Sequence, residues 1–382
     1  MTHRGPEAPE LTSASSAGRM GDGAAGGTGS PPAVPGAPGR GHVSGGSGGT
    51  PGRAFARRNA GFVVLAVVVL CLPLFVSDIY YLSILAFMAT RFIVVIGLNL
   101  LMAQAGQISL GHAAFVGLGA YGSAILVTKA GFNPWVAMVV AAALSAAVAV
   151  VIGIPTLRLK GHYLAMATLG FGEIVLILMI QLKGLTNGTD GITGVPPLTI
   201  GGLDFSEPKA YHFLVWGVAL VVFLLAQNLT SSRVGRSLRA LRRSEIAAES
   251  LGVNTSYRKV QVFALSAVLA SIAGSFDAHY IQFVSPDQFS ITFSIILVTS
   301  VVVGGFRSVW GALWGTMVVV ILPEVVKRFN EDAVNLVFGL MLILLMIFTP
   351  IRFGWLDGLR KRLRRGGGAP STPPDGGRKR GG

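Results

Sequence analysis

The sequence contains little charge and almost no cysteine. Only 13% of its 382 residues are charged, about half the share usual in a soluble globular domain, whereas 52% are hydrophobic and the mean hydropathy is +0.64. Cys71 is the single cysteine, which excludes a disulfide within the chain and a cysteine-based metal cluster. No Gly-Lys dipeptide occurs, so the chain lacks a phosphate-binding loop of the G-x-x-x-x-G-K-S/T kind and cannot hydrolyse ATP by that route.

A common hydrolase signature is missing as well. There is no H-E-x-x-H, and the six histidines are scattered. Nothing pairs a nucleophile with a base. We therefore expect no catalytic residue, no metal site and no cofactor in this chain, and no enzymatic activity.

What the sequence does contain is long, continuous apolar runs. Several reach the roughly 20 residues that cross about 30 Å of hydrocarbon, so we expect an all-α polytopic membrane protein with about ten transmembrane helices. Asn133 before Pro134 is typical of a helix start, and Pro323 predicts a kink. The expected spans are 60–76, 80–102, 110–128, 134–154, 162–182, 211–229, 260–283, 288–304, 309–327 and 333–349.

The two ends of the chain differ from this apolar middle. Residues 1–52 are rich in Gly, Pro, Ser and Ala and predict a disordered cytoplasmic tail, because they cannot bury enough surface to fold. Residues 351–382 predict a second, basic and flexible tail. The transmembrane domain is expected at 53–350.

The basic residues are distributed unevenly between the two predicted sides. With ten spans and a cytoplasmic N-terminus, 25 of the 31 lysines and arginines fall on the inner side, five fall on the outer side, and Arg91 lies within a span. The positive-inside rule therefore favours N-in and C-in. Topology and attraction to anionic lipid head groups explain the net charge of +14 without nucleic acid.

One inner segment, Gly235–Val253, is a polar and basic island between apolar runs. Its spacing predicts a short amphipathic helix that ends at Gly252. Such a helix on the cytoplasmic side is typical of a membrane protein to which a soluble partner binds. An ordinary solvated connector is the alternative.

Two further segments have the composition of a transport pathway. In the first, Gln107, Ser109 and His112 are expected to edge a polar path, whereas the glycines indicate either tight helix packing or a broken helix. The second contains Glu173, an ionisable residue within a span and so a functional candidate, and Arg91 could pair with it. The candidate pathway residues are Gly106, Gln107, Ser109, Gly111, His112, Gly170, Gly172 and Glu173.

Together these segments resemble the LivM-type permease subunit of bacterial branched-chain amino acid ABC importers. The resemblance covers nearly all of residues 60–350. It rests on Gly97–Leu101, Gly106–Phe115, Leu157–Ile174, Thr189–Ile192, Glu245–Ala247, Leu251–Gly252 and Phe283–Pro286.

The resemblance implies a multi-pass protein of the bacterial cell membrane that works in a complex. The implied partners are two ATP-binding subunits on the cytoplasmic face, a second permease subunit and an extracytoplasmic solute-binding protein, with ATP bound by the partner subunits. Ser244–Gly252 would be the coupling helix that docks on an ATP-binding subunit. Its expected contacts are Glu245, Ala247, Ala248 and Gly252, flanked by Arg239, Arg242 and Arg243, and the outer loop would present Thr189, Asp190 and Gly191.

Two other functions stay open from the residues alone. A stand-alone secondary transporter or channel for small polar solutes would use a membrane-embedded acid, for which Glu173 is the candidate. It would leave the inner helix unexplained. A membrane enzyme would need a catalytic constellation, which the sequence does not provide.

Overall fold

The computed structural model describes residues 51–75, 78–306, 308–327, 336 and 339–340. The chain divides into two units, residues 1–57 and 58–382, and the described part of the first is only the beginning of helix α1 (Pro51–Phe75). The predicted tails lie outside the described residues, except that residues 51 and 52 begin α1. The tenth predicted span, 333–349, also lies outside them apart from residues 336, 339 and 340.

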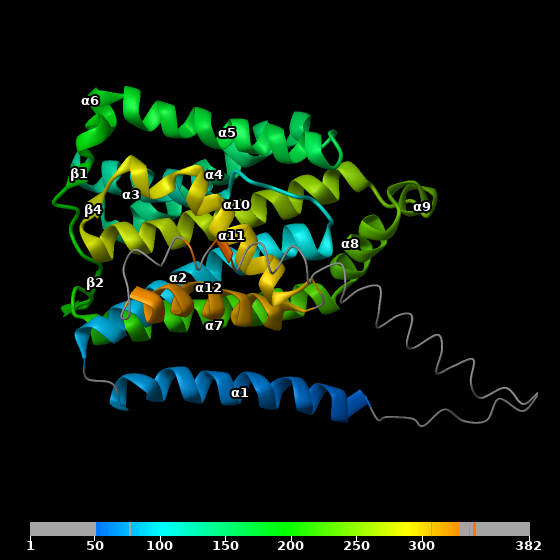
Figure 1. The fold of residues 1–382 in the computed structure, drawn as a ribbon, viewed down its shortest axis with the longest axis horizontal. Coiled ribbons are helices and arrows are strands. Elements are labelled where there is room, and N and C mark those ends of the chain that lie inside the picture. The colour runs from blue at the N-terminus through cyan, green and yellow to red at the C-terminus, as the bar shows by residue number, and fades with distance from the viewer. Residues whose placement is uncertain (1–50, 76–77, 307, 328–335, 337–338, 341–382) are drawn as a thin grey trace, which may run out of the picture. The chain divides into compact units, whose positions relative to one another are not determined.

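The second unit is built from helices that run side by side (Figure 1). Among the described residues, seven helical segments are long and apolar enough to cross a membrane. Two shorter apolar helices, Gly61–Phe75 and His112–Thr128, also correspond to predicted spans, so nine predicted spans have a described helix. The long helices are α2 (Ile79–Asn99), α4 (Pro134–Thr156), α5 (His162–Gln181), α7 (Pro208–Ser231), α10 (Thr255–Ile281), α11 (Ile291–Gly304) and α12 (Val309–Lys327), and the shorter ones include α3 (His112–Thr128). The expected all-α polytopic fold is confirmed.

Side-chain caps explain where several helices begin. Asp78 accepts a hydrogen bond from the Tyr80 amide at the start of α2, and Asn133 accepts one from Trp135 at the start of α4, with Pro134 at the first helical position as predicted. The end of α2 is unusual, because it continues as a π-helix, η1 (Leu100–Gln104), whose side chains are buried. Wide turns of this kind often mark functional sites.

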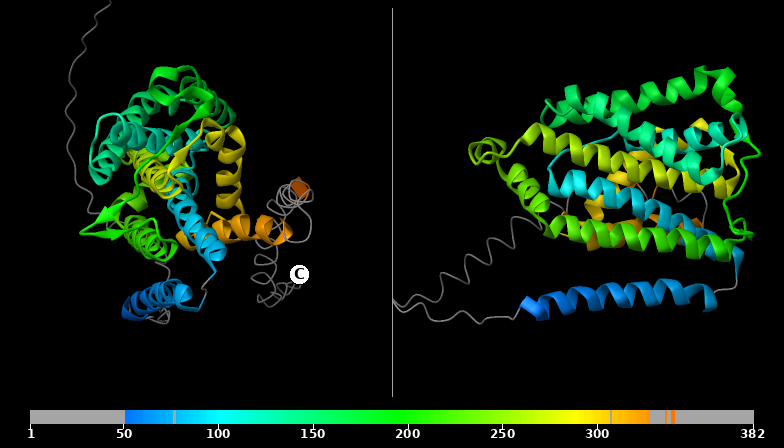
Figure 2. Two further views of the ribbon diagram at one scale, coloured as in Figure 1. Left: turned by 90° about the vertical axis from the view of Figure 1, so that its left-hand side faces the viewer. Right: turned by 180° about the vertical axis from the view of Figure 1, so that it is seen from behind.

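Short elements gather at the two opposite ends of the helices (Figures 1 and 2). One end has α8 (Arg233–Arg243) and α9 (Glu245–Ser250). The other has α6 (Lys183–Thr186), a 3₁₀ turn η2 (Gly188–Asp190), and two small antiparallel sheets. Those sheets are β1 (Ile192–Thr193) with β4 (Phe283–Val284), and β2 (Thr199–Ile200) with β3 (Leu203–Asp204); a 3₁₀ turn η3 (Pro286–Phe289) precedes α11.

Polar contacts near the helix ends agree with the predicted alternation of sides. At the α9 end, the Lys160 ammonium lies 3.6 Å from the Glu245 carboxylate. At the opposite end, Lys129 donates to the Gly184 carbonyl at 2.7 Å and the Trp135 indole donates to the Thr199 carbonyl at 2.9 Å. Loops that the sequence assigns to one side of the membrane therefore meet at one end of the structure.

The core lies between α2, α3 and α10. Phe92 of α2 packs against Trp216 and Phe223 of α7, and Phe115 of α3 packs against Phe263 of α10. The described spans differ greatly in burial. The most apolar window of the α2–η1 span is 78% buried within the chain, whereas that of α5 is 28% buried.

Helices α3 and α10 approach so closely that glycine is required at their contact. A Cβ atom at Gly119 would lie 2.1 Å from the Ser271 carbonyl oxygen, and one at Gly274 would lie 2.0 Å from that of Val116. Small residues allow this approach in a membrane protein. The packing explanation for the glycines of this region is therefore correct at Gly119.

Replacing Gly119 tests this contact. We expect Gly119→Ala to lower the free energy of unfolding by about 1–3 kcal/mol, because the added methyl group forces two backbones apart. The matched control is Gly217→Ala in α7, where no atom lies within 4 Å of the added methyl group. A helical Gly-to-Ala change in open space should be neutral or stabilising. Equal thermal midpoints for the two variants in detergent would contradict the close-packing account.

Candidate functional site

The polar inner segment folds as two helices, not one. Helix α8 ends at Arg243, Ser244 is extended with φ −161° and ψ 117°, and α9 then runs from Glu245 to Ser250. The break has a local cause: the Ser244 hydroxyl accepts a hydrogen bond from the Ala247 amide and so caps the start of α9. The predicted single amphipathic helix is wrong in this respect, whereas Gly252, with φ +78°, does follow the helix end.

Helix α9 presents a different face from the one expected. Ala248 is 1% exposed and cannot contact a partner, whereas Ile246 and Leu251 are 76% and 81% exposed. Ala247 is also exposed. The sequence already held the signal for Ile246 and Leu251, since they are the large apolar residues of Ser244–Gly252. They are the contact candidates that sequence reasoning missed.

Glu245 is tied to its own chain instead of pointing to a partner. Its carboxylate accepts a 2.6 Å hydrogen bond from Lys259 of α10 and lies 3.6 Å from the ammonium of Lys160. Partial burial by itself would raise the pKa of Glu245, but the hydrogen bond and charge of Lys259, aided by Lys160, outweigh it and lower the pKa. The ionised carboxylate therefore fixes α9 to α10 and to the residues before α5.

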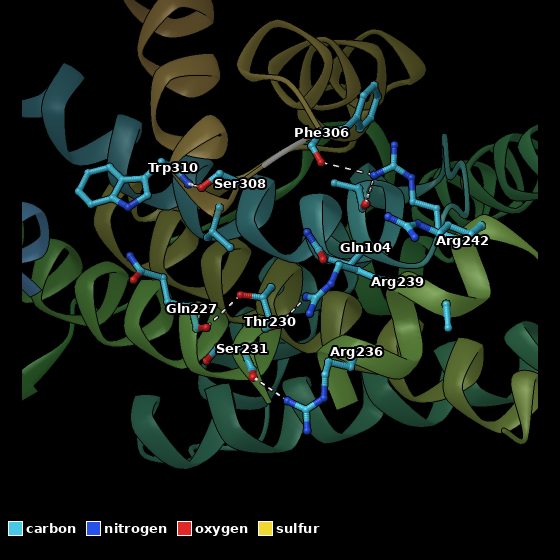
Figure 3. A pocket seen from close by; sticks show the side chains of 14 residues that line it. Gln104, Gln227, Thr230, Ser231, Arg236, Arg239, Arg242, Phe306, Ser308 and Trp310 are labelled. Atoms are coloured by element: carbon cyan, nitrogen blue, oxygen red, sulfur yellow. Dashed lines mark hydrogen bonds between the residues drawn. The ribbon is translucent and has the colours of Figure 1, made fainter. Parts of the chain in front are cut away.

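The arginines of α8 face a cavity. The Arg239 guanidinium donates to the Thr230 carbonyl at 2.6 Å, and that of Arg242 donates to the Ala103 carbonyl at 2.5 Å (Figure 3). Arg243 lines the same cavity of about 1050 Å³. Two of the three expected flanking arginines are thus bonded to α7 and η1 of this chain.

The first pathway segment turns from η1 into α3. Gly106 has φ +72°, and a Cβ atom there would lie 3.2 Å from Cγ of Arg242, so glycine is needed at this turn. Gln107 is half-buried and donates to the Ala105 carbonyl at 3.2 Å. It alone of the three expected polar residues reaches the surface of the described structure.

Ser109 and His112 are buried in a satisfied hydrogen-bond chain. The His112 Nδ1 atom lies 2.9 Å from the Ser109 hydroxyl, and its Nε2 atom lies 3.0 Å from the Ser266 hydroxyl. Ser266 also donates to the Phe263 carbonyl, so the neutral tautomer with Nε2 protonated fits all three bonds. These side chains join α3 to α10 and do not edge an open path in this conformation, contrary to the expectation.

The two pathway segments do meet in space. A Cβ atom at Gly111 would lie 2.2 Å from the Thr168 carbonyl oxygen, and one at Gly172 would lie 3.5 Å from Cα of Gly111. The Thr168 hydroxyl accepts a hydrogen bond from the Leu110 amide at 3.0 Å. The start of α3 therefore rests directly on α5. Gly170, by contrast, has no atom within 4 Å of a Cβ position.

Arg91 pairs with Asp277, not with Glu173. The Arg91 guanidinium lies 2.5 Å from the Asp277 carboxylate and stacks 4.5 Å from the ring centre of Phe293. The pairing of Arg91 with Glu173 is therefore wrong. Glu173 is half-buried on α5 and forms no ion pair with another described residue. Helix spacing along one chain could not reveal which of the distant helices α5 and α10 faces α2.

The outer motif is anchored by its glycine. Gly191 has φ +71°, and a Cβ atom there would lie 2.3 Å from the Val284 carbonyl oxygen. The next residue, Ile192, pairs with Val284 in the sheet β1–β4. Thr189 and Asp190 precede this anchor and are exposed, at the end of the helices opposite to α9 (Figure 2).

Comparison with known proteins places this architecture in a family. A family described as "Branched-chain amino acid transport system / permease component" matches residues 80–346. The chain is 34% identical over 297 residues to the high-affinity branched-chain amino acid transport system permease protein LivM of Escherichia coli (strain K12), a match that covers 72% of this chain and 69% of that protein. No solved structure gives a significant match.

Two further relatives show how far the similarity extends. LivM of Salmonella typhimurium (strain LT2) is 34% identical over 278 residues, 67% of this chain and 65% of that protein, so the chain spans about two thirds of the length of these LivM proteins. The ribose import permease protein RbsC of Escherichia coli (strain K12) is 26% identical over 281 residues, 72% of this chain and 83% of that protein. The chain belongs to the family of permease components of branched-chain amino acid transport systems, and it is a multi-pass protein of the cell membrane.

Proposed function

We propose that this chain is the permease subunit of an ATP-driven importer that moves branched-chain or related small amino acids across the membrane. The single observation that carries the coupling to ATP is a pair of exposed apolar residues, Ile246 on the short helix α9 and Leu251 directly after it. Burying each of them in a partner groove would contribute roughly 1.5–3 kcal/mol. The substrate class comes from the similarity to LivM.

The attachment of α8 and α9 suits them to transmit motion. Glu245 of α9 bonds Lys259 of α10, and Arg239 and Arg242 of α8 bond carbonyls at the ends of α7 and η1. A displacement of α9 would therefore be transmitted to α10, α7 and the α2–η1 span as a rigid-body movement. Switching transitions commonly take this form. We propose that ATP itself is bound by two partner subunits on the cytoplasmic face, since this sequence has no phosphate-binding loop.

A second permease subunit would cover α5. This span has the least buried apolar window among the described spans, and its half-buried Glu173 has no ionic partner among the described residues. A lone carboxyl group facing lipid is costly. A path between two permeases, lined here by Gly170, Gly172 and Glu173 with Gln107 at its inner end, would remove that cost. Thr189, Asp190 and Gly191 would lie on the outer side, where a solute-binding protein delivers substrate.

Uptake in cells tests this proposal. Deleting the gene should abolish high-affinity uptake of labelled leucine, isoleucine or valine, and the full chain should restore it. The same cells should keep ribose uptake, which separates the substrate class of LivM from that of RbsC. Unchanged uptake of all three amino acids after deletion would exclude branched-chain amino acids as the substrates.

The unpaired Glu173 also favours a second candidate, a secondary transporter that relays a proton. The variant Glu173→Gln separates the two functions, because it keeps the size and polarity of the side chain but cannot ionise. If ATP drives transport, the uptake rate of this variant should stay within a few-fold of the wild-type rate, with the same dependence on pH as the wild type. If Glu173 relays a proton, uptake driven by a proton gradient should be abolished.

A further inference from the structure

The cavity beside α8 has a composition that the import function does not require. It has a volume of about 1050 Å³, slightly above the roughly 300–1,000 Å³ typical of small-molecule pockets. Its walls come from the ends of η1 and α7, from α8, and from the start of α12 (Figure 3). Its polar and charged lining residues are Gln104, Gln227, Thr230, Ser231, Arg236, Arg239, Arg242, Arg243 and Ser308.

No described residue compensates the charge of the cavity. Among the described residues, four arginines line it and no carboxylate does. None of the four takes part in the ion pairs of the described residues. Their hydrogen bonds go to backbone carbonyls, such as the 3.4 Å bond from Arg236 to Ser231. A guanidinium group has five N–H donors, and the four arginines are exposed like charges along one short helix, so a bound anion would use their free donors and relieve their repulsion.

Two buried side-chain amides in the wall lack hydrogen-bond partners that a simple anion could not both supply. Gln227 and Gln104 are 7% and 5% exposed, and neither the Gln227 Nε2 donor nor the Gln104 Oε1 acceptor has a partner among the described residues. Buried amide groups without partners are uncommon and costly. A ligand that offers both an anionic oxygen and a hydroxyl group would supply the acceptor and the donor that these two groups lack.

The cavity lies at the depth where lipid head groups are found. Three membrane segments end or begin at its wall: η1 ends at Gln104, α7 ends at Ser231, and α12 begins at Val309. Trp310 also lines the cavity, and tryptophan is enriched at the membrane–water interface. Arginine pairs especially well with phosphate oxygens, because its planar fork donates two parallel hydrogen bonds.

We propose that this cavity binds the phosphate group of an anionic phospholipid whose head group also carries a hydroxyl, with phosphatidylglycerol as the test compound. The arginines bind the phosphate, and the two glutamine amides complete the contacts to phosphate and hydroxyl. The site is independent of the proposed import function, because it requires no partner subunit and no substrate.

Binding of one phosphatidylglycerol molecule to the full chain in detergent can be titrated by native mass spectrometry. Removing two cavity charges in Arg236→Gln/Arg239→Gln should weaken binding at least tenfold. The control Arg233→Gln/Arg258→Gln removes two charges from the same side but outside the cavity, and it should keep affinity within a few-fold. Gln227→Leu leaves the charge unchanged and should weaken binding by about fivefold through the lost donor.

The outcomes separate a built site from general attraction. Equal weakening by the two charge-matched pairs, or no effect of Gln227→Leu, would overturn the proposal. Inorganic phosphate and pyrophosphate form the second arm, and displacement of the lipid by either at the same concentration would assign the site to a soluble phosphate instead of a head group. Gel filtration and the thermal midpoint identify any variant that fails to fold. If the cavity variant fails, Arg236→Lys is measured in its place, and we expect a smaller loss of lipid affinity.

Discussion

Placing an aspartate at Ile246 and Leu251 should reduce ATP-dependent uptake at least 100-fold. Both side chains, one on α9 and one at its C-terminal cap, are more than three-quarters exposed, so the substitutions cost the isolated chain little. In the complex they would put two carboxylates into an apolar groove, and each buried unpaired charge costs several kcal/mol. Uptake by proteoliposomes that contain the whole complex and internal ATP gives the rate.

The control for this double variant lies at the other end of the helices. Ile200 on β2 is 48% exposed, and Ile200→Asp should leave binding of the ATP-binding subunits unchanged. The thermal midpoint of the isolated chain should stay the same for all three substitutions. Uptake near the wild-type rate in Ile246→Asp/Leu251→Asp would exclude α9 as the coupling element.

Breaking the Arg91–Asp277 ion pair should have the largest effect on folding. Asp277→Ala should lower the free energy of unfolding by about 3–5 kcal/mol, because it leaves the largely buried Arg91 guanidinium without its carboxylate inside a membrane domain. Arg91→Ala should cost a similar amount, since it also removes the stacking on Phe293. Unfolding in a graded denaturing detergent measures both.

The double variant distinguishes the pair from its two members. Arg91→Met/Asp277→Leu removes both charges and replaces them with apolar side chains of comparable size, so it should recover most of the stability lost in either single variant. If the double variant is as unstable as the sum of the singles, the two residues act separately. If Asp277→Ala matches the wild type, the ion pair does not stabilise the fold.

The spans could be predicted because each depends only on local composition. Nine of the ten expected segments correspond to described apolar helices, and the caps at Asn133 and Pro134 follow from the side chains next to the helix start. The end of the structure at which each loop lies also follows from counting the spans before it. These features need no knowledge of which helices are neighbours.

The candidate site could be predicted only in part, because its contacts join distant helices. Asp277 lies 186 positions from Arg91, and nothing in the spacing indicates that α10, and not α5, faces Arg91. The break at Ser244 does not follow from the amphipathic pattern, which continues through it, whereas the helix Ser244–Gly252 that the resemblance implies does correspond to α9. The residue types at Ala248 and His112 fit a buried or an exposed position equally well. Only the packing of the helices decides that both are buried.

We propose above all that this permease works as one subunit of a complex that binds α9 from the cytoplasm. Quantitative mass spectrometry of the tagged chain, purified gently from its own membrane, tests this most directly. The account predicts two ATP-binding subunits and one second permease subunit for each copy of this chain. Recovery of the chain alone, or only with further copies of itself, would contradict it.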